Sequence, residues 1–244
     1  MNNFLRFTLL SIVIHLIGLS FSFSQSAPII NTNSPIYKAE AFFNSSIKEQ
    51  SLLFNGTFFK DYPETVDGSA NFQDLQTFSK GTIFYHDFRF DSIPLMYDLY
   101  EDKIISLLNN NKYALRSDKV SDFYYNNHHF KYINVIDSTK SVIKSGFYDM
   151  IYEGKSKILV KRTKTLQVSQ DDKSIRYYFQ PKTYYYLERG GKYQSITGEK
   201  SFLSYFEDRK AELKKQLKEN KIKFRKSPEA AMVLLATYYE KLLR

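Results

Sequence analysis

The sequence of 244 residues contains no cysteine and no tryptophan. The lack of cysteine excludes disulfides, thiolate metal sites and cysteine nucleophiles together. It also excludes the lipid that bacterial lipoproteins carry on a cysteine, so we do not expect a lipoprotein. After residue 23 no apolar run approaches the length of about 20 residues that spans a bilayer. Because disulfides are excluded, the fold must be stabilised by packing rather than by cross-links.

Residues 1–24 have the features of a signal peptide. Arg6 supplies a positive charge, the largely apolar run Phe7–Phe23 follows, and Ser22-Phe23-Ser24 provides the small residues that precede a cleavage site. Polar residues interrupt the apolar run, which favours cleavage over a retained membrane anchor. We therefore expect export through a cleaved signal peptide to the periplasm or the cell exterior. We also expect a flexible leader over residues 25–36 and no transmembrane segment in the mature form.

The composition is that of a globular protein, with 43% hydrophobic and 25% charged residues. The 21 phenylalanines and 20 tyrosines supply much of the material for a core. The formal net charge is +9, and removal of Arg6 with the signal peptide leaves about +8. Outside the cytoplasm such a charge attracts anionic lipid or glycan rather than nucleic acid, although it is also typical of an ordinary solvated surface.

From residue 54 onward, apolar alternation and turn residues predict strands. The expected strands are Gly81–Phe90, Ile93–Leu99, Lys103–Leu108, Tyr113–Leu115, Phe130–Val135, Phe147–Tyr152, Ile158–Val168, Ile175–Phe179, Thr183–Glu188 and Tyr193–Ile196. Within the first, alternation would place Phe84, Phe88 and Phe90 on one face. Turns are expected at Asn109-Asn110-Asn111, Glu153-Gly154-Lys155, Gln180-Pro181-Lys182 and Arg189-Gly190-Gly191-Lys192.

Helices are expected at both ends of the mature chain. Residues 37–54 have mixed helical spacing and predict a short helix. In the C-terminal part, Phe202, Phe206, Leu213 and Leu217 form one helical stripe, and Ser227-Pro228-Glu229 is a typical helix start.

These elements predict an α+β fold. We expect a mainly antiparallel sheet of about eight to ten strands, either a curved half-barrel or two small sheets, closed by two C-terminal helices. The β-rich domain would cover residues 37–198, with a candidate sub-boundary near residues 136–146. The helical pair would cover residues 199–244 and pack on the sheet.

Several short motifs carry a resemblance. They are Leu53-Phe54-Asn55-Gly56, Gly81-Thr82-Ile83-Phe84-Tyr85, Pro94-Leu95-Met96-Tyr97-Asp98, Gly146-Phe147-Tyr148 and Ile151-Tyr152-Glu153-Gly154. Together with Tyr238-Tyr239 in the helical end, they resemble a group of uncharacterised exported proteins from Bacteroidetes-type bacteria. The resemblance extends over most of the mature chain. It implies a shared location and fold, and it brings no activity and no catalytic residues.

Candidate chemistry rests on carboxylates and tyrosines. Asp98 and Asp102 are the catalytic candidates, because a glycosidase needs two carboxyl groups held across a sugar. Acids in such positions are also what turns and strand ends require. Tyr178, Tyr184 and Tyr186 are the ligand-binding candidates, because exposed tyrosine rings can stack on sugars or contact a partner. Filling of the core is the alternative role for these rings.

Metal and cofactor sites are not expected. His128-His129 follows Asn126-Asn127 and is expected in a loop, and neighbouring residues of a strand would point to opposite faces. No glycine-rich phosphate-binding loop occurs.

Three functions remain open from the sequence. The favoured hypothesis is a non-enzymatic binding or accessory module of the bacterial envelope, with an envelope protein, a glycan or an anionic lipid surface as partner. The alternatives are a carboxylate-based enzyme acting on glycans and a periplasmic carrier of a lipid or acyl chain.

Overall fold

The computed structural model describes Pro35, Leu53 and residues 55–137, 139, 141–170 and 174–243. Apart from Pro35 and Leu53, the signal peptide, the leader and the helix expected over residues 37–54 lie outside the described residues. The chain divides into two compact units, residues 1–39 and 40–244. The second unit contains the elements described below.

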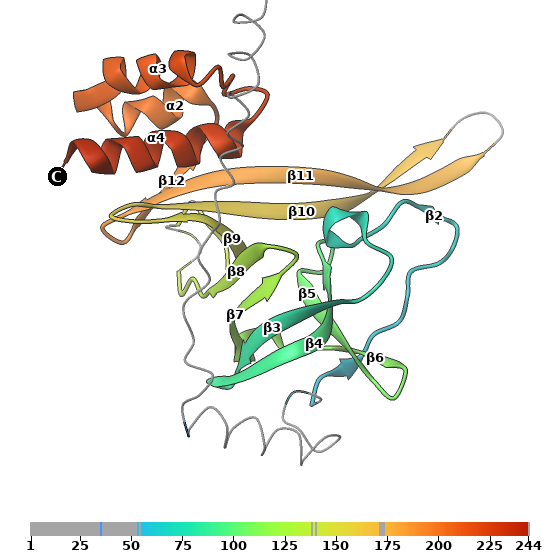
Figure 1. Ribbon diagram of the computed structural model, residues 1–244. Helices are drawn as coiled ribbons and strands as arrows, with labels where there is room; N and C mark the ends of the chain where they lie inside the picture. The colour runs from blue at the N-terminus through green and yellow to red at the C-terminus, as the bar shows by residue number, and fades with distance from the viewer. Residues whose placement is uncertain are drawn as a thin grey trace, which may run out of the picture. The chain divides into compact units, whose positions relative to one another are not determined.

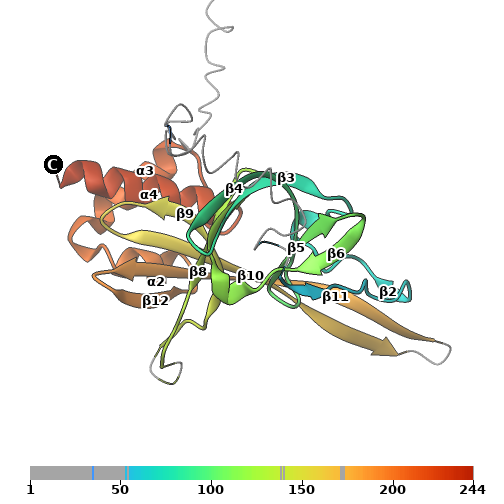
Figure 2. The same ribbon diagram turned by 90° about the horizontal axis from the view of Figure 1, so that it is seen from below.

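The described part of this unit is an α+β structure built on one twelve-stranded sheet that is not closed into a barrel (Figures 1 and 2). The strands are β1 (Thr57–Phe58), β2 (Val66–Asp67), β3 (Ser79–Tyr85), β4 (Phe88–Asp98), β5 (Lys103–Leu108), β6 (Asn111–Ala114), β7 (Val120–Tyr125), β8 (His128–Ile133), β9 (Gly146–Glu153), β10 (Lys157–Gln170), β11 (Ile175–Arg189) and β12 (Lys192–Ile196). Their order is β1-β6-β5-β4-β3-β7-β8-β9-β10-β11-β12, with β2 added in parallel to β11. β8 and β9 pair directly, so the sheet continues across the segment near residues 136–146.

Tight hairpins connect many of the neighbouring strands. His86 and Asp87 between β3 and β4 have φ angles of 50° and 64°, and the pairs Asn109-Asn110 and Asn126-Asn127 have φ angles between 48° and 63°. Two consecutive residues with positive φ are characteristic of the type I′ turn, whose twist matches that of the strands. The strand expected over Gly81–Phe90 is therefore wrong as a single strand, because it reverses direction at His86.

The longest hairpin is formed by β10 and β11, which stay in unbroken register from Lys157↔Glu188 to Gln170↔Ile175. Figure 1 shows it extending past the rest of the sheet. The turn expected at Gln180-Pro181-Lys182 is wrong, since β11 runs straight through it. Pro181 pairs with Lys164, whose N–H points away from β11 to the carbonyl of Leu99 at 3.1 Å. By the same alternation the nitrogen of Pro181 faces the outer edge of β11, where no ladder bond is lost.

The C-terminal part contains three helices rather than the expected two. They are α2 (Glu199–Ser204), α3 (Lys210–Glu219) and α4 (Pro228–Leu242). The first predicted stripe is divided because the backbone leaves helical geometry at Phe206, with φ −129° and ψ 42°, and continues as a 3-10 turn over Glu207–Arg209. The Ser204 hydroxyl donates to the carbonyl of Ser201, a local bond that competes with continuation of the helix.

Alternation along β9 separates the two faces of the sheet. Phe147, Asp149 and Ile151 point to the face that we call inner, and Tyr148 and Met150 point to the outer face. The inner face carries two apolar clusters. One lies within the curved strands and includes Phe72, Tyr97, Phe123, Phe130 and Phe147. The other lies under the helices and includes Ile158, Val160, Leu187, Phe202, Phe206 and Leu235.

Candidate functional site

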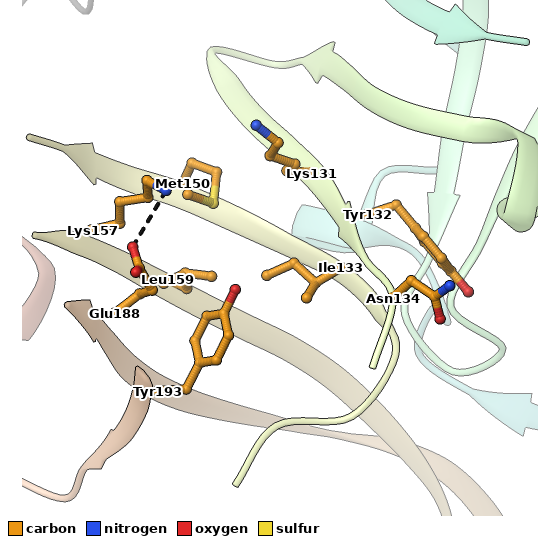
Figure 3. Close-up of a pocket in the computed structure, with 9 residues that line it drawn as sticks. All are labelled: Lys131, Tyr132, Ile133, Asn134, Met150, Lys157, Leu159, Glu188 and Tyr193. Atoms are coloured by element: carbon orange, nitrogen blue, oxygen red, sulfur yellow. Dashed lines mark ion pairs between the residues drawn. The ribbon is translucent and has the colours of Figure 1, made fainter. Parts of the chain in front are cut away.

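The outer face carries a small cup at the point where β8 to β12 lie side by side. Ile133, Met150 and Leu159 form its apolar floor, and the ring of Tyr193 forms one wall (Figure 3). Leu159 is paired with Met150 on one side and with Tyr186 on the other, which fixes these side chains on one face. The cup therefore depends on the register of five consecutive strands.

Polar groups of both charges surround this floor. Lys131, Asn134, Lys157 and Glu188 line the cup, and its volume is about 230 Å³. The Lys157 ammonium lies 3.3 Å from the Glu188 carboxylate, which also accepts a hydrogen bond from the N–H of Gly191 at 2.6 Å. Glu188 is thus held in place from two directions, and Lys157 is half-exposed beside it.

Burial raises the pKa of the Tyr193 hydroxyl, and the nearby Glu188 carboxylate raises it further, while Lys157 lowers it. The phenol therefore stays protonated at neutral pH and remains a hydrogen-bond donor. An apolar floor, an aromatic wall, a phenol donor and a Lys–Glu pair together suit a small ligand with one apolar side and several hydroxyl groups.

The three tyrosines singled out in the sequence share this outer face. Tyr186 packs edge-on against Tyr148 with ring centroids 5.9 Å apart and borders the apolar floor. Tyr184 lies two residues before Tyr186 on β11 and is exposed. Tyr178 lies six residues before Tyr184 on the same face and is half-buried. Because the register of β11 with β10 is unbroken, the three rings point to the same face of β11, and Tyr186 lies nearest to the cup at Tyr193.

Asp98 is fully buried at the end of β4. Its carboxylate accepts hydrogen bonds from the Tyr62 hydroxyl at 2.6 Å and from the N–H groups of Tyr100 and Glu101 at 2.7 and 2.9 Å. Burial raises the pKa of this carboxyl, and the three donors oppose that rise. These contacts cap the turn that follows β4.

Asp102 is bound within the protein as well. Its carboxylate accepts from the Tyr97 hydroxyl at 2.6 Å, lies 2.5 Å from the Lys161 ammonium and accepts from the N–H of Phe147 at 3.3 Å. Burial lowers the pKa of Lys161, and Asp102 opposes this change. Both carboxylates are thus occupied by donors from their own chain.

His128 and His129 begin β8 rather than lying in a loop, and they point to opposite faces of the sheet. His128 belongs to a polar network on the inner face that sequence reasoning missed. His128 Nδ1 lies 2.7 Å from the buried carboxylate of Asp149, which also pairs with Arg162 at 2.7 Å. Arg162 in turn bonds both carboxylate oxygens of Glu229 at the start of α4. The available signal was an acid, Asp149, in the middle of an apolar strand.

Three further observations limit the chemistry. Among the described residues, no group of three or more His, Asp or Glu side chains is arranged to hold a metal ion. No helix in the described ranges is both long and apolar enough to cross a membrane. The curved part of the inner face is packed with rings, with Phe123 and Phe130 stacked at 4.8 Å and Tyr97 edge-on to both.

No protein-family model, no curated protein and no solved structure matches the chain.

Proposed function

We propose that this chain is an exported envelope protein that binds a glycan without chemically altering it, with one sugar ring held in the outer-face cup. The observation that carries the proposal is the convergence of Tyr193, the Lys157–Glu188 pair and the apolar floor, with Tyr186 and Tyr184 continuing along the same face. A pyranose ring has an apolar face that stacks on aromatic rings and hydroxyls that need both donors and acceptors.

The size of the cup narrows the ligand class. Pockets for drug-sized ligands measure about 300–1,000 Å³, and this cup measures about 230 Å³. It suits a single sugar unit better than a lipid acyl chain. Longer glycans would continue along β11 over Tyr184 and toward Lys182, whose side chain lies on the same face of the sheet. The basic balance of the chain favours glycans that carry negative charge.

The two alternative functions receive less support. A carrier needs an apolar cavity, and in the described residues the corresponding inner face is filled by stacked rings. A carboxylate enzyme needs two acids facing a cleft, whereas Asp98 and Asp102 are each engaged by three donors of the protein itself.

The test is binding of the mature protein to an array of bacterial envelope polysaccharides. Replacement of Tyr193→Ala or Tyr184→Ala should weaken glycan binding about fivefold to thirtyfold, because each change removes an aromatic contact of roughly 1–2 kcal/mol. Tyr177→Ala is the matched control, since Tyr177 is an exposed tyrosine of the same strand on the inner face. A glycan that binds all three variants equally, or no bound glycan at all, would refute the proposal.

Two measurements separate the alternatives. Native mass spectrometry of protein purified gently from its own envelope would reveal a retained lipid if the carrier function holds. Release of reducing sugar from a bound glycan, lost in Asp102→Asn, would instead indicate an enzyme. We expect neither a retained lipid nor sugar release.

A further inference from the structure

The β10–β11 hairpin has one protected edge and one open edge. The open edge is the edge of β10 that faces away from β11, from Thr165 to Gln170. β9 pairs with β10 only between Lys157 and Val160, and the Lys164 N–H bonds to Leu99. Beyond Lys164, no strand of the described chain pairs with this side of β10. A row of backbone donors and acceptors is therefore available there.

The other edge of the hairpin carries the features that normally prevent strand addition. β2 covers β11 at Tyr177 and Tyr178, and Pro181 with Lys182 follows. Proline and lysine are residues that natural proteins place on exposed edges to block pairing with other chains. The contrast between the two edges indicates that the edge of β10 is left open for a partner.

The open edge carries no charged residue, and its alternate residues Leu166 and Val168 are apolar. Residues 165–170 read Thr-Leu-Gln-Val-Ser-Gln, without a charge, in a chain with 25% charged residues. Leu166 is 37% exposed and Val168 60% exposed. An exposed, regular and uncharged edge strand is a ready site for strand pairing.

The direction of the backbone groups fixes a register. The Lys164 N–H points away from β11, and alternate residues of a strand direct their N–H groups to the same edge. The N–H groups of Leu166 and Val168 therefore also point away from β11, toward the open edge. We propose that this edge pairs antiparallel with the same edge of a second copy of the chain, about a two-fold axis at Gln167. Leu166 of one copy then lies opposite Val168 of the other, and these two residues exchange backbone hydrogen bonds in both directions.

A second copy fits this edge better than an unrelated strand for two reasons. The pattern is self-complementary, since apolar Leu166 faces apolar Val168 and Gln167 faces itself on the outer face. The neutral segment also lets two basic copies, each with a net charge of about +8 in the mature form, approach without placing like charges opposite each other. A two-fold arrangement of this kind forms a closed dimer rather than a fibre.

The absence of cysteine permits a direct test by cross-linking. In the proposed dimer the two Gln167 residues form a non-hydrogen-bonded pair with Cα atoms about 4.5 Å apart, within the range in which a disulfide forms. The full mature chain carrying Gln167→Cys should oxidise rapidly to a disulfide-linked dimer. Thr163→Cys is the control on the same face, because its counterpart in the second copy would lie about 26 Å away, eight residues along the strand.

Sedimentation equilibrium of the native chain provides the second measurement. We expect a mass that rises from monomer to dimer with concentration. Val168→Pro should remain monomeric, because proline removes the outward N–H without breaking a bond to β11, whereas Val168→Ala should still dimerise. A native chain that stays monomeric at every concentration, or equal cross-linking of the two cysteine variants, would overturn the proposal.

Discussion

Arg162 and Glu229 form a bidentate ion pair, with both nitrogen–oxygen distances at 2.9 Å, that joins β10 to the first turn of α4. The same guanidinium contacts Asp149 on β9 at 2.7 Å. Burial by itself would lower the pKa of Arg162, but the contacts with Glu229 and Asp149 raise it. One side chain thus connects two strands and a helix between the two apolar clusters of the inner face.

Replacing Arg162→Met should lower the free energy of unfolding by about 3–5 kcal/mol, because the carboxylate of Asp149 would stay buried without its cation. Urea denaturation measures this change. Arg116→Met is the control, since Arg116 forms an exposed ion pair with Asp118, and we expect a change of about 1 kcal/mol or less. Equal losses in the two variants would contradict a structural role for the buried pair.

The raised pKa of Asp98 predicts a pH dependence of stability. Between its ordinary pKa of 3.8 and its raised value, the folded state binds a proton that the unfolded state releases. Stability contributed by this group is therefore present below pH 3.8 and is lost as the pH rises through the folded pKa. Asp98→Asn cannot ionise, so its stability relative to the native chain should increase as the pH rises through this window. A constant difference between the two unfolding profiles would contradict the prediction.

The turn between β3 and β4 predicts a stabilising change. His86 and Asp87 both adopt positive φ, which disfavours most residues with a side chain. The double replacement of His86→Asn and Asp87→Gly should raise the unfolding free energy by about 1 kcal/mol, because Asn-Gly is the preferred type I′ pair. Gly190→Ala is the opposite change and serves as the control. Gly190 has a φ of 60°, so the alanine variant should have a lower free energy of unfolding than the native chain. Thermal denaturation checks both changes.

The same turn shows why alternation in a sequence can mislead. A type I′ turn needs only two residues, and His86-Asp87 lacks the glycine that would reveal it. The pairing places Tyr85 opposite Phe88 and Ile83 opposite Phe90, so Phe90 shares a face with Ile83 and not with Phe84. The fold class was nevertheless predictable, because the alternation and the turn residues identify strands whatever their connection.

The candidate site was predictable only in part. The tyrosines of β11 stand out in the sequence, and the structure places Tyr184 and Tyr186 on one face. The cup was not predictable, because it combines Ile133, Leu159 and Tyr193 from strands far apart in the sequence. Their meeting depends on register across the sheet, including the irregularity in β9–β10 pairing between residues 158 and 159. A single sequence contains no local signal for that register.

The last prediction concerns the replacement of Lys164. This lysine is buried, and its ammonium donates to the carbonyls of Ser69 and Asn71 at 2.5 and 2.9 Å and pairs with Asp74. It thereby holds the loop before β3 against the long hairpin. Lys164→Met keeps the apolar stem of the side chain but leaves both carbonyls without this donor, which should cost about 1–3 kcal/mol.

The decisive measurement for Lys164→Met is hydrogen exchange resolved along the chain. Exchange should accelerate in the loop 69–75, because the loop loses its anchor on β10 while the β10–β11 ladder keeps its own bonds. Lys182→Met, on the exposed outer face of the same hairpin, removes an equal charge and should leave the loop unchanged. If the loop exchanged at the native rate in Lys164→Met, it would be held instead by its backbone contacts with the end of β4, where the Leu99 N–H donates to the carbonyl of Ala70 at 2.9 Å and Asn71 bridges to Asp98.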